Sequence, residues 1–198
     1  MSEIIYFFNQ LNSITRIIES IAVISSVIYV ILAAKQNIWC WSFAIISTIL
    51  YIYICLTAKL FAETALQFFY LAMAGYGYYQ WNGSEKARSI TQWNITNHFF
   101  AITLGAILTL LIGFYLKTYT EAEMPIIDSF TTVFSIIATY MVTRKVLENW
   151  LYWIAIDSIS IYLYLNRDLH LTSLLFVLYT IIAIFGYFSW RKKIKIHV

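Results

Sequence analysis

The sequence predicts an all-α membrane protein with seven transmembrane helices, arranged as two three-helix repeats joined by one linker helix. Of its 198 residues, 61% are hydrophobic and the mean hydropathy is +0.73, which is more apolar surface than a soluble domain of this length can bury. Charged residues make up only 12% of the chain, and they stand mainly between apolar runs. Two aromatic motifs recur in the same order in the two halves of the chain.

Seven apolar segments are long enough to cross about 30 Å of hydrocarbon. They span 17–34, 38–57, 60–81, 98–116, 126–142, 148–165 and 170–190. Polar stretches such as "TAK" and "NRDLH" separate them, and the only proline, Pro125, lies in a connection, so no proline kink is predicted. The start, "MSEIIYFFNQLNS", lacks the basic region of a cleavable signal peptide.

Several classes of chemistry find no support in the sequence. Cys40 and Cys55 lie in one predicted helix, roughly 22 Å apart at 1.5 Å per residue, so no disulfide is expected. His98, His170 and His197 are scattered at span ends, which predicts no metal site. No glycine-rich phosphate loop and no nucleophile–base pair is found, so we expect neither ATP-driven transport, nor an enzyme, nor a cofactor.

The basic residues predict the orientation of the chain. In a seven-span protein alternate loops lie on opposite sides, and the side with more Lys and Arg faces the cytoplasm. We therefore expect the N-terminus outside and the C-terminus, with its basic tail "RKKIK", in the cytoplasm as a membrane anchor and not as a nucleic-acid site. One side carries Lys35, Lys86, Arg88, Arg144, Lys145, Arg191, Lys192, Lys193 and Lys195, and the other Arg16, Lys59, Lys117 and Arg167.

The repeat is predicted from two motifs. Asn-x3-Trp occurs in "NIWCW" and again in "NWLYW", and Tyr-x6-Gly-x3-Trp begins at Tyr70 and again at Tyr179. Within one transmembrane domain over 1–198, these matches predict a first repeat over 17–81, a linker helix over 98–116 and a second repeat over 126–190. One linker span returns the chain to its starting side, so the two repeats run in parallel.

The sixth span carries the main candidate site. Trp150, Trp153 and Asp157 fall on one helical face, because positions i, i+3 and i+7 lie within about 60° of each other. Ionisable groups inside a membrane are costly, and indole faces attract cations. This face therefore predicts a site for a flat cationic ring, with Tyr164 as a further member. An interfacial role for Trp150 stays open.

Other spans add polar candidates. Glu63 and Gln67 share a face of the third span with Tyr70, and Gln67 can both donate and accept hydrogen bonds. Glu63 has an alternative place among the outer headgroups, and Glu19 and Asp128 stand at corresponding depths of the two repeats. Interfacial positions are favoured for Trp81 and Trp190. Close helix packing is favoured for Gly77 and Gly186. The spans hold almost no basic residues, which favours an unphosphorylated substrate.

Two stretches carry a family resemblance. "NIWCWSFAIISTILYIYICLTAKLFAETALQFFYLAMAGYGYYQW" and "ENWLYWIAIDSISIYLYLNRDLHLTSLLFVLYTIIAIFGYFSW" resemble the signature regions of the Pnu vitamin transporter family, and the resemblance extends over about 17–193. It implies a 3+1+3 fold similar to the SWEET sugar transporters, a homotrimer in the bacterial inner membrane, and facilitated diffusion by alternating access. It further implies a dephosphorylated vitamin as substrate, trapped afterwards by a cytoplasmic kinase.

The resemblance also assigns substrate contacts. Trp150 and Trp153 match the family's Trp-x2-Trp-x3-Asn motif, whose last position is Asp157 here; Gln67 matches the third-span glutamine, and Tyr179 is expected on the same cavity. Asp157 suits the cationic rings of nicotinamide riboside, the leading substrate, and of thiamine, the alternative; neutral riboflavin is least favoured. The expected partners are the small-molecule vitamin and membrane lipid, and no nucleic acid is expected. A sensor or assembly subunit without transport activity is the alternative of another class.

Overall fold

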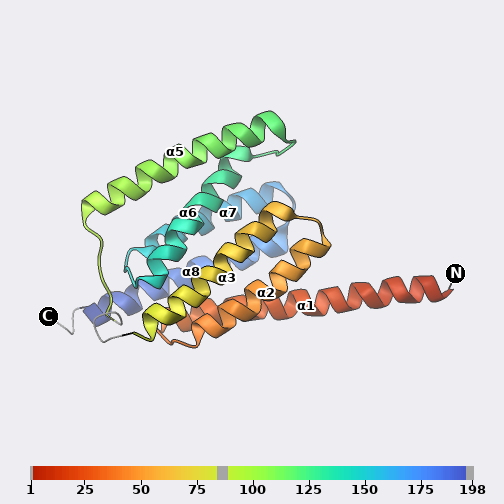
Figure 1. Cartoon of the computed structure of the whole chain (residues 1–198), viewed down its shortest axis with the longest axis horizontal. Coiled ribbons are helices and arrows are strands. Elements are labelled where there is room, and N and C mark those ends of the chain that lie inside the picture. Colours follow the sequence, from red (N-terminus) through yellow and green to blue (C-terminus); the bar gives the residue numbers. More distant parts are fainter. Residues whose placement is uncertain (1, 84–88, 195–198) are drawn as a thin grey trace. The chain divides into compact units, whose positions relative to one another are not determined.

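The computed structural model describes residues 2–83 and 89–194, and the side chains of these residues except 2–13, 61 and 62. Within this part of the chain there are seven helices and no strand, which confirms the predicted all-α class (Figure 1). The helices are α1 (Ser2–Ala34), α2 (Cys40–Thr57), α3 (Phe61–Trp81), α5 (Ile95–Tyr119), α6 (Pro125–Thr143), α7 (Asn149–Asn166) and α8 (His170–Ile194). Lys86, Arg88, Lys195 and His197 lie outside the described residues.

Five of the described helices are long and apolar enough to cross a membrane: Ile14–Ala34 of α1, and α2, α5, α6 and α8. The other two, α3 and α7, have the length of a span but more polar side chains. These are the helices that carry Glu63, Gln67 and Asp157. The polar candidates therefore stand on the two helices that fit hydrocarbon least well.

The largest difference from the predicted boundaries lies at the first helix. α1 begins at Ser2, although the apolar segment begins near residue 17, because no glycine or proline interrupts the helix between these points. α5 begins at Ile95, since the side-chain oxygen of Asn94 accepts a hydrogen bond from the Asn97 amide at 2.9 Å. The other helix ends lie within four residues of the predicted ones.

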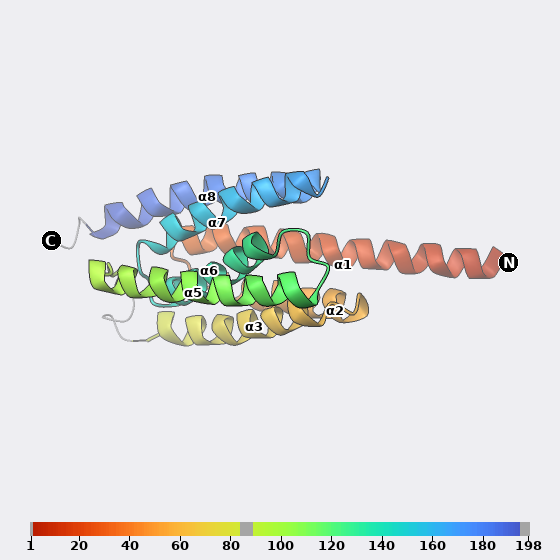
Figure 2. The same cartoon turned by 90° about the horizontal axis from the view of Figure 1, so that it is seen from above.

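The chain divides into two compact units, Met1–Tyr79 and Gln80–Val198. In the first unit α1 packs against α2, and α1 extends well beyond the end of its neighbour in both views (Figures 1 and 2). The Ser47 hydroxyl on α2 donates to the Ala22 carbonyl on α1 at 2.9 Å. On α3, Gly77 lies directly against the ring of Trp41.

In the second unit α7 packs against both α6 and α8, and α5 packs against α6. The close contact of α5 with α6 depends on glycine, because a Cβ atom added at Gly105 would lie 2.8 Å from Cζ of Phe134. Phe134, Ala138 and Ile156 form a buried apolar cluster between α6 and α7. This cluster fixes the face of α7 that turns towards the interior of the unit.

The turns on either side of α2 and of α7 have the same geometry. Gln36 and Lys145 precede the two helices with φ of 58° and 51°, and Lys59 and Asp168 follow them with φ of 58° and 56°. Both helices have 18 residues. Lys145 follows Gln36 by the same number of residues as Asp168 follows Lys59. We call this difference in residue number, which relates α2 to α7, the common offset.

At the common offset Trp41 corresponds to Trp150. The Asn-x3-Trp match paired Trp41 with Trp153 instead, so it does not fit the turn geometry. The two asparagines of that motif also occupy different places. Asn37 lies in a turn and accepts a hydrogen bond from a nearby backbone amide at 3.0 Å, whereas Asn149 is the first residue of α7.

Candidate functional site

The turn before α7 is held by the segment that precedes α5. The Thr91 amide donates to the Lys145 carbonyl at 2.9 Å, and the Leu147 amide donates to the Thr91 carbonyl at 2.8 Å. The carboxylate of Glu148 accepts from the Trp93 amide at 3.1 Å. These bonds fix the start of α7, and so the starting point of the face that carries the candidate residues.

Trp150 lies in the first turn of α7 and is only 2% exposed. A Cβ atom added at Gly186 on α8 would lie 2.7 Å from Cδ2 and Cε2 of the Trp150 ring, so the indole rests directly on the glycine. The Trp190 ring meets it edge to face, with centroids 5.4 Å apart and an interplanar angle of 90°. The predicted role of Gly186 as a close helix contact is confirmed, and Gly77 has the same role against Trp41.

Trp81 and Trp190 are buried, so the interfacial positions that the sequence favoured for them are wrong. Their ring centroids lie 6.0 Å apart. The indole N–H of Trp81 donates to the Val142 carbonyl at 3.3 Å, and the ammonium of Lys145 lies 4.5 Å from the Trp81 ring centroid. A position near the end of a span does not decide whether a tryptophan faces lipid or core. Here the two rings pack against each other, and that of Trp190 also packs against Trp150.

Trp153 is half-buried and packs at the edge of the cluster formed by Phe134, Ala138 and Ile156. Tyr152 beside it is held by a contact of 3.1 Å between its hydroxyl and Nδ1 of His98. Trp153 thus keeps part of its ring accessible, in contrast to Trp150. Of the two tryptophans of the predicted site, it is the one with surface left for a ligand.

Asp157 is 3% exposed, one turn beyond Trp153 on the same face of α7. Among the described residues its carboxylate takes part in no hydrogen bond and no ion pair. A buried carboxylate without a partner is costly, and bringing a cation to it reduces that cost. Ser160, also 3% exposed and about one turn further, continues this face; its spacing from Asp157 is the signal that could have identified it.

Tyr179 belongs to a row of aromatic rings between α7 and α8. Tyr164 stacks on Phe176 with centroids 5.2 Å apart and planes 15° apart, and Phe176 meets Tyr179 edge to face at 5.9 Å. Phe176, which lies on the same helix as Tyr179, thus packs against the Tyr179 ring. It also brings Tyr164, which shares the predicted face of α7, into contact with α8.

Glu63 and Gln67 belong to the first unit, whereas the other four predicted site residues belong to the second. Glu63 is exposed in the first turn of α3, and Gln67 is half-buried one turn later. Within the residues that the structure describes, the amide of Gln67 has no hydrogen-bond partner. Gln67 therefore stays a predicted contact of the substrate.

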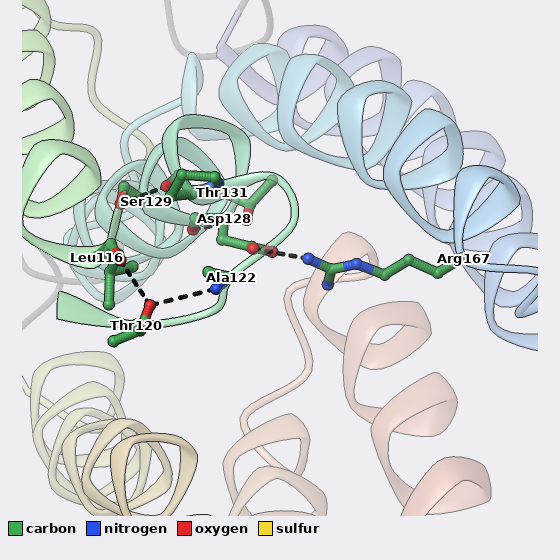
Figure 3. A network of polar contacts seen from close by, with 8 residues as sticks. Leu116, Thr120, Ala122, Asp128, Ser129, Thr131 and Arg167 are labelled. Atoms are coloured by element: carbon green, nitrogen blue, oxygen red, sulfur yellow. Dashed lines mark hydrogen bonds and ion pairs between the residues drawn. The ribbon is translucent and has the colours of Figure 1, made fainter. Parts of the chain in front are cut away.

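Asp128 lies in the first turn of α6 and forms an ion pair with Arg167, which follows the end of α7 (Figure 3). The distance from Nη2 of Arg167 to Oδ2 of Asp128 is 2.7 Å, and both side chains are about a quarter exposed. This hydrogen bond raises the pKa of the Arg167 guanidinium. Asp128 thus joins the start of one helix to the end of another, a role that sequence spacing could not show because its partner is 39 residues away.

Among the described residues, no three His, Cys, Asp or Glu side chains lie together as metal ligands would. Cys40 and Cys55 are both buried and free. What the geometry offers is one buried carboxylate, one partly accessible indole, and neighbouring hydroxyl groups. Such a set can bind a flat organic cation, and it contains no group arranged for covalent catalysis.

Comparison with known proteins gives a consistent result. The family model described as nicotinamide mononucleotide transporter matches residues 16–192. The nicotinamide riboside transporter PnuC of Neisseria mucosa is 24% identical over 198 residues, which cover 90% of this chain and 73% of that protein. The riboflavin/roseoflavin transporter RibM of Streptomyces davaonensis is 24% identical over 165 residues, covering 80% and 77%.

A solved structure shares the fold. The crystal structure of the vitamin B3 transporter PnuC superposes with a TM-score of 0.74 and covers 99% of this chain and 88% of that chain, at 22% sequence identity. At this identity the similarity establishes the arrangement of the backbone. The side chains that select a substrate have to be argued from this chain's own residues.

Proposed function

The chain belongs to the nicotinamide mononucleotide transporter family, and from this premise we propose that it takes up an unphosphorylated cationic vitamin, nicotinamide riboside. That it is a multi-pass transporter for a vitamin in a bacterial inner membrane, and not an enzyme, follows from its membrane-spanning helices and from the family. The substrate and the contacts that select it are the proposal.

The observation that carries the proposal is the buried carboxylate of Asp157 one turn from the accessible indole of Trp153. The nicotinamide ring of the riboside bears a positive charge because its nitrogen is bonded to the ribose, so it can stack on Trp153 while Asp157 supplies the counter-charge. Stacking of a cation on indole contributes about 0.5–2 kcal/mol, depending on how far water is excluded. An ion pair inside a membrane protein adds to this, since the carboxylate has no other partner among the described residues.

The same charges favour the riboside over the mononucleotide. Helices α2, α3, α6 and α7 contain no Lys or Arg, so none of them can neutralise a phosphate. Asp157 would repel that phosphate. The buried ammonium of Lys145 already lies over Trp81. A substrate that is cationic and carries no phosphate fits these residues better.

The remaining predicted contacts are part of the proposal. Gln67 and Glu63 on α3, and Tyr179 on α8, would bind the hydroxyl and amide groups of the vitamin, and each can be tested by single substitution. The proposal also includes a 3+1+3 repeat, a homotrimer, an outside N-terminus and a cytoplasmic C-terminus. Transport would be facilitated diffusion by alternating access, followed by phosphorylation of the vitamin in the cytoplasm.

The experiment is a titration of the purified protein with nicotinamide riboside, thiamine and riboflavin in parallel, followed by tryptophan fluorescence. The same protein in proteoliposomes is then assayed for uptake of each vitamin. Saturable quenching by nicotinamide riboside together with its uptake supports the proposal. If the protein binds a vitamin but takes up none of the three, the result would instead support a sensor.

Thiamine is the second candidate, and Asp157 is the observation that favours it. Thiamine also carries a cationic ring, and a carboxylate in place of an amide removes a hydrogen-bond donor that a ribose or carboxamide could use. Tight binding of thiamine alone would reassign the substrate. Riboflavin is neutral and larger, so preferential riboflavin binding would contradict the role given to Asp157.

A further inference from the structure

We propose that Trp150 is a positioning residue: it sets the rotation of α7 against α8 and leaves the contact with the vitamin to Trp153. This inference rests on the proposed function, because it concerns how the same face of α7 binds its substrate. It divides a pair of tryptophans, alike in sequence, into one that packs and one that binds.

The first argument is the surroundings of the Trp150 ring. One face of the indole rests on the backbone of Gly186, and the ring of Trp190 packs against it at right angles. Only 2% of the residue is exposed. A vitamin could stack on this ring only after Gly186 or Trp190 had moved away, whereas Trp153 is half-buried and needs no such change.

The second argument is that the first unit contains the same tryptophan–glycine contact. Trp41 on α2 is 1% exposed and lies directly on Gly77 of α3. At the common offset these two residues correspond to Trp150 and Gly186. The same contact is therefore found in each unit, between α2 and α3 and between α7 and α8. In both units the first helix of the pair follows a turn residue with a positive φ, that is, in the left-handed conformation.

Counterparts of Trp153 and Asp157, in contrast, are missing from α2 of the first unit. At the places of Trp153 and Asp157, α2 carries Ala44 and Thr48. A tryptophan on a glycine thus occurs in a helix that lacks both the second indole and the charge. The contact itself belongs to helix packing, and the chemistry for a cationic substrate is added to it only in α7.

The third argument is geometric. Trp150, Trp153 and Asp157 lie on one face of α7, so any rotation of the helix about its axis moves all three together. Glycine at 186 lets the indole of Trp150 approach the α8 backbone, which fixes that rotation. A methyl group at this position would push the ring outward and turn Trp153 and Asp157 away from their bound orientation.

The test compares Trp150→Phe, Gly186→Ala and the double variant with wild type and with Trp153→Phe. Affinity for nicotinamide riboside and the amplitude of fluorescence quenching are measured, and Trp41→Phe in the first unit is the matched control. We expect Gly186→Ala to weaken binding about tenfold, and the smaller phenylalanine of the double variant to restore it to within about threefold of wild type. Quenching should persist in Trp150→Phe and in Trp41→Phe, and be lost in Trp153→Phe.

A loss of quenching in Trp150→Phe equal to that in Trp153→Phe would overturn the inference, and so would a double variant that binds no better than Gly186→Ala. If Gly186→Ala does not yield folded protein, the quenching amplitude of Trp150→Phe decides alone. Failure of the proposed function looks different: wild type then does not bind nicotinamide riboside. If wild type binds thiamine instead, the same variants are compared for their affinity for thiamine.

Discussion

α2 and α7 are built alike and differ at the two positions of α7 that we propose bind the substrate. Each has 18 residues, begins after a left-handed turn residue and places a tryptophan on a glycine of the helix that follows. Where α7 carries Asp157, α2 carries Thr48, whose hydroxyl donates to the Ala44 carbonyl at 2.7 Å within its own helix. One helix satisfies its polar group internally, whereas the carboxylate of the other has no partner among the described residues, and for this reason we propose it as the counter-charge of the substrate.

We infer that helix placement and substrate binding are separable in this protein. The turns and the tryptophan–glycine contacts recur in both units, whereas Trp153 and Asp157, the proposed binding residues, have no counterpart in α2. Substitutions made in matched pairs, one in each unit, test this separation.

The largest effect is expected from Asp157→Ala with Thr48→Ala as its control. Removing the counter-charge should weaken binding of the cationic vitamin by about 2–4 kcal/mol, whereas Thr48→Ala should change it by less than about 0.5 kcal/mol. Isothermal titration calorimetry measures both. Asp157→Asn keeps the volume and isolates the charge. Equal losses at positions 48 and 157 would remove the distinction between the two helices.

Trp153→Ala should weaken binding by about 1–3 kcal/mol, because it removes the ring on which the vitamin stacks. Trp39→Ala is the control, since Trp39 is 65% exposed in the first unit and is not among the proposed contacts. Fluorescence titration and uptake assays measure the effect. An unchanged affinity of the Trp153 variant would place the substrate elsewhere.

Gly186→Ala and Gly77→Ala should each lower the free energy of unfolding by about 1–2 kcal/mol, because the added methyl group meets a tryptophan ring. Gly75→Ala is the matched control. A Cβ atom added there meets nothing within 4 Å, so alanine should stabilise α3 by up to about 1 kcal/mol. Thermal melting in detergent distinguishes them. A similar response at all three positions would show that helix propensity, and not the tryptophan contact, determines the result.

The smallest effect is expected from Arg167→Ala, which breaks the ion pair with Asp128. Both side chains are partly exposed, so the loss of stability should be about 0.5 kcal/mol and should shrink at high salt. Glu19, which corresponds to Asp128 at the common offset, has no ion pair within the described residues, so Glu19→Gln should change little. A larger loss in Glu19→Gln would contradict this asymmetry.

The fold could be predicted from sequence because apolar runs of membrane length leave few alternatives. The start of α1 could not, since nothing in "SEIIYFFNQLNS" stops a helix and the length of an apolar run does not limit it. The close packing at Gly77 and Gly186 followed from residue size. The burial of Trp81 and Trp190 did not follow, because a tryptophan near a helix end suits either an interface or a core.

The site was predictable only as a helical face. Spacing placed Trp150, Trp153 and Asp157 together, but it gave both tryptophans the same weight. Tertiary packing separates them, since Gly186 lies directly against the ring of Trp150. Likewise the partner of Asp128 lies 39 residues away in sequence, and no local pattern points to it.

The four left-handed turn residues matter in practice for anyone who needs this protein to survive in detergent. Gln36, Lys59, Lys145 and Asp168 hold positive φ angles without being glycine, a conformation that costs a side-chain-bearing residue about 1 kcal/mol or more. Gln36→Gly, Lys59→Gly and Asp168→Gly would each remove this backbone strain, and all three positions lie outside α7. Lys145 should be kept, because its ammonium also lies over the Trp81 ring. A more robust transporter for crystallisation or cryo-microscopy can therefore be engineered at its turns.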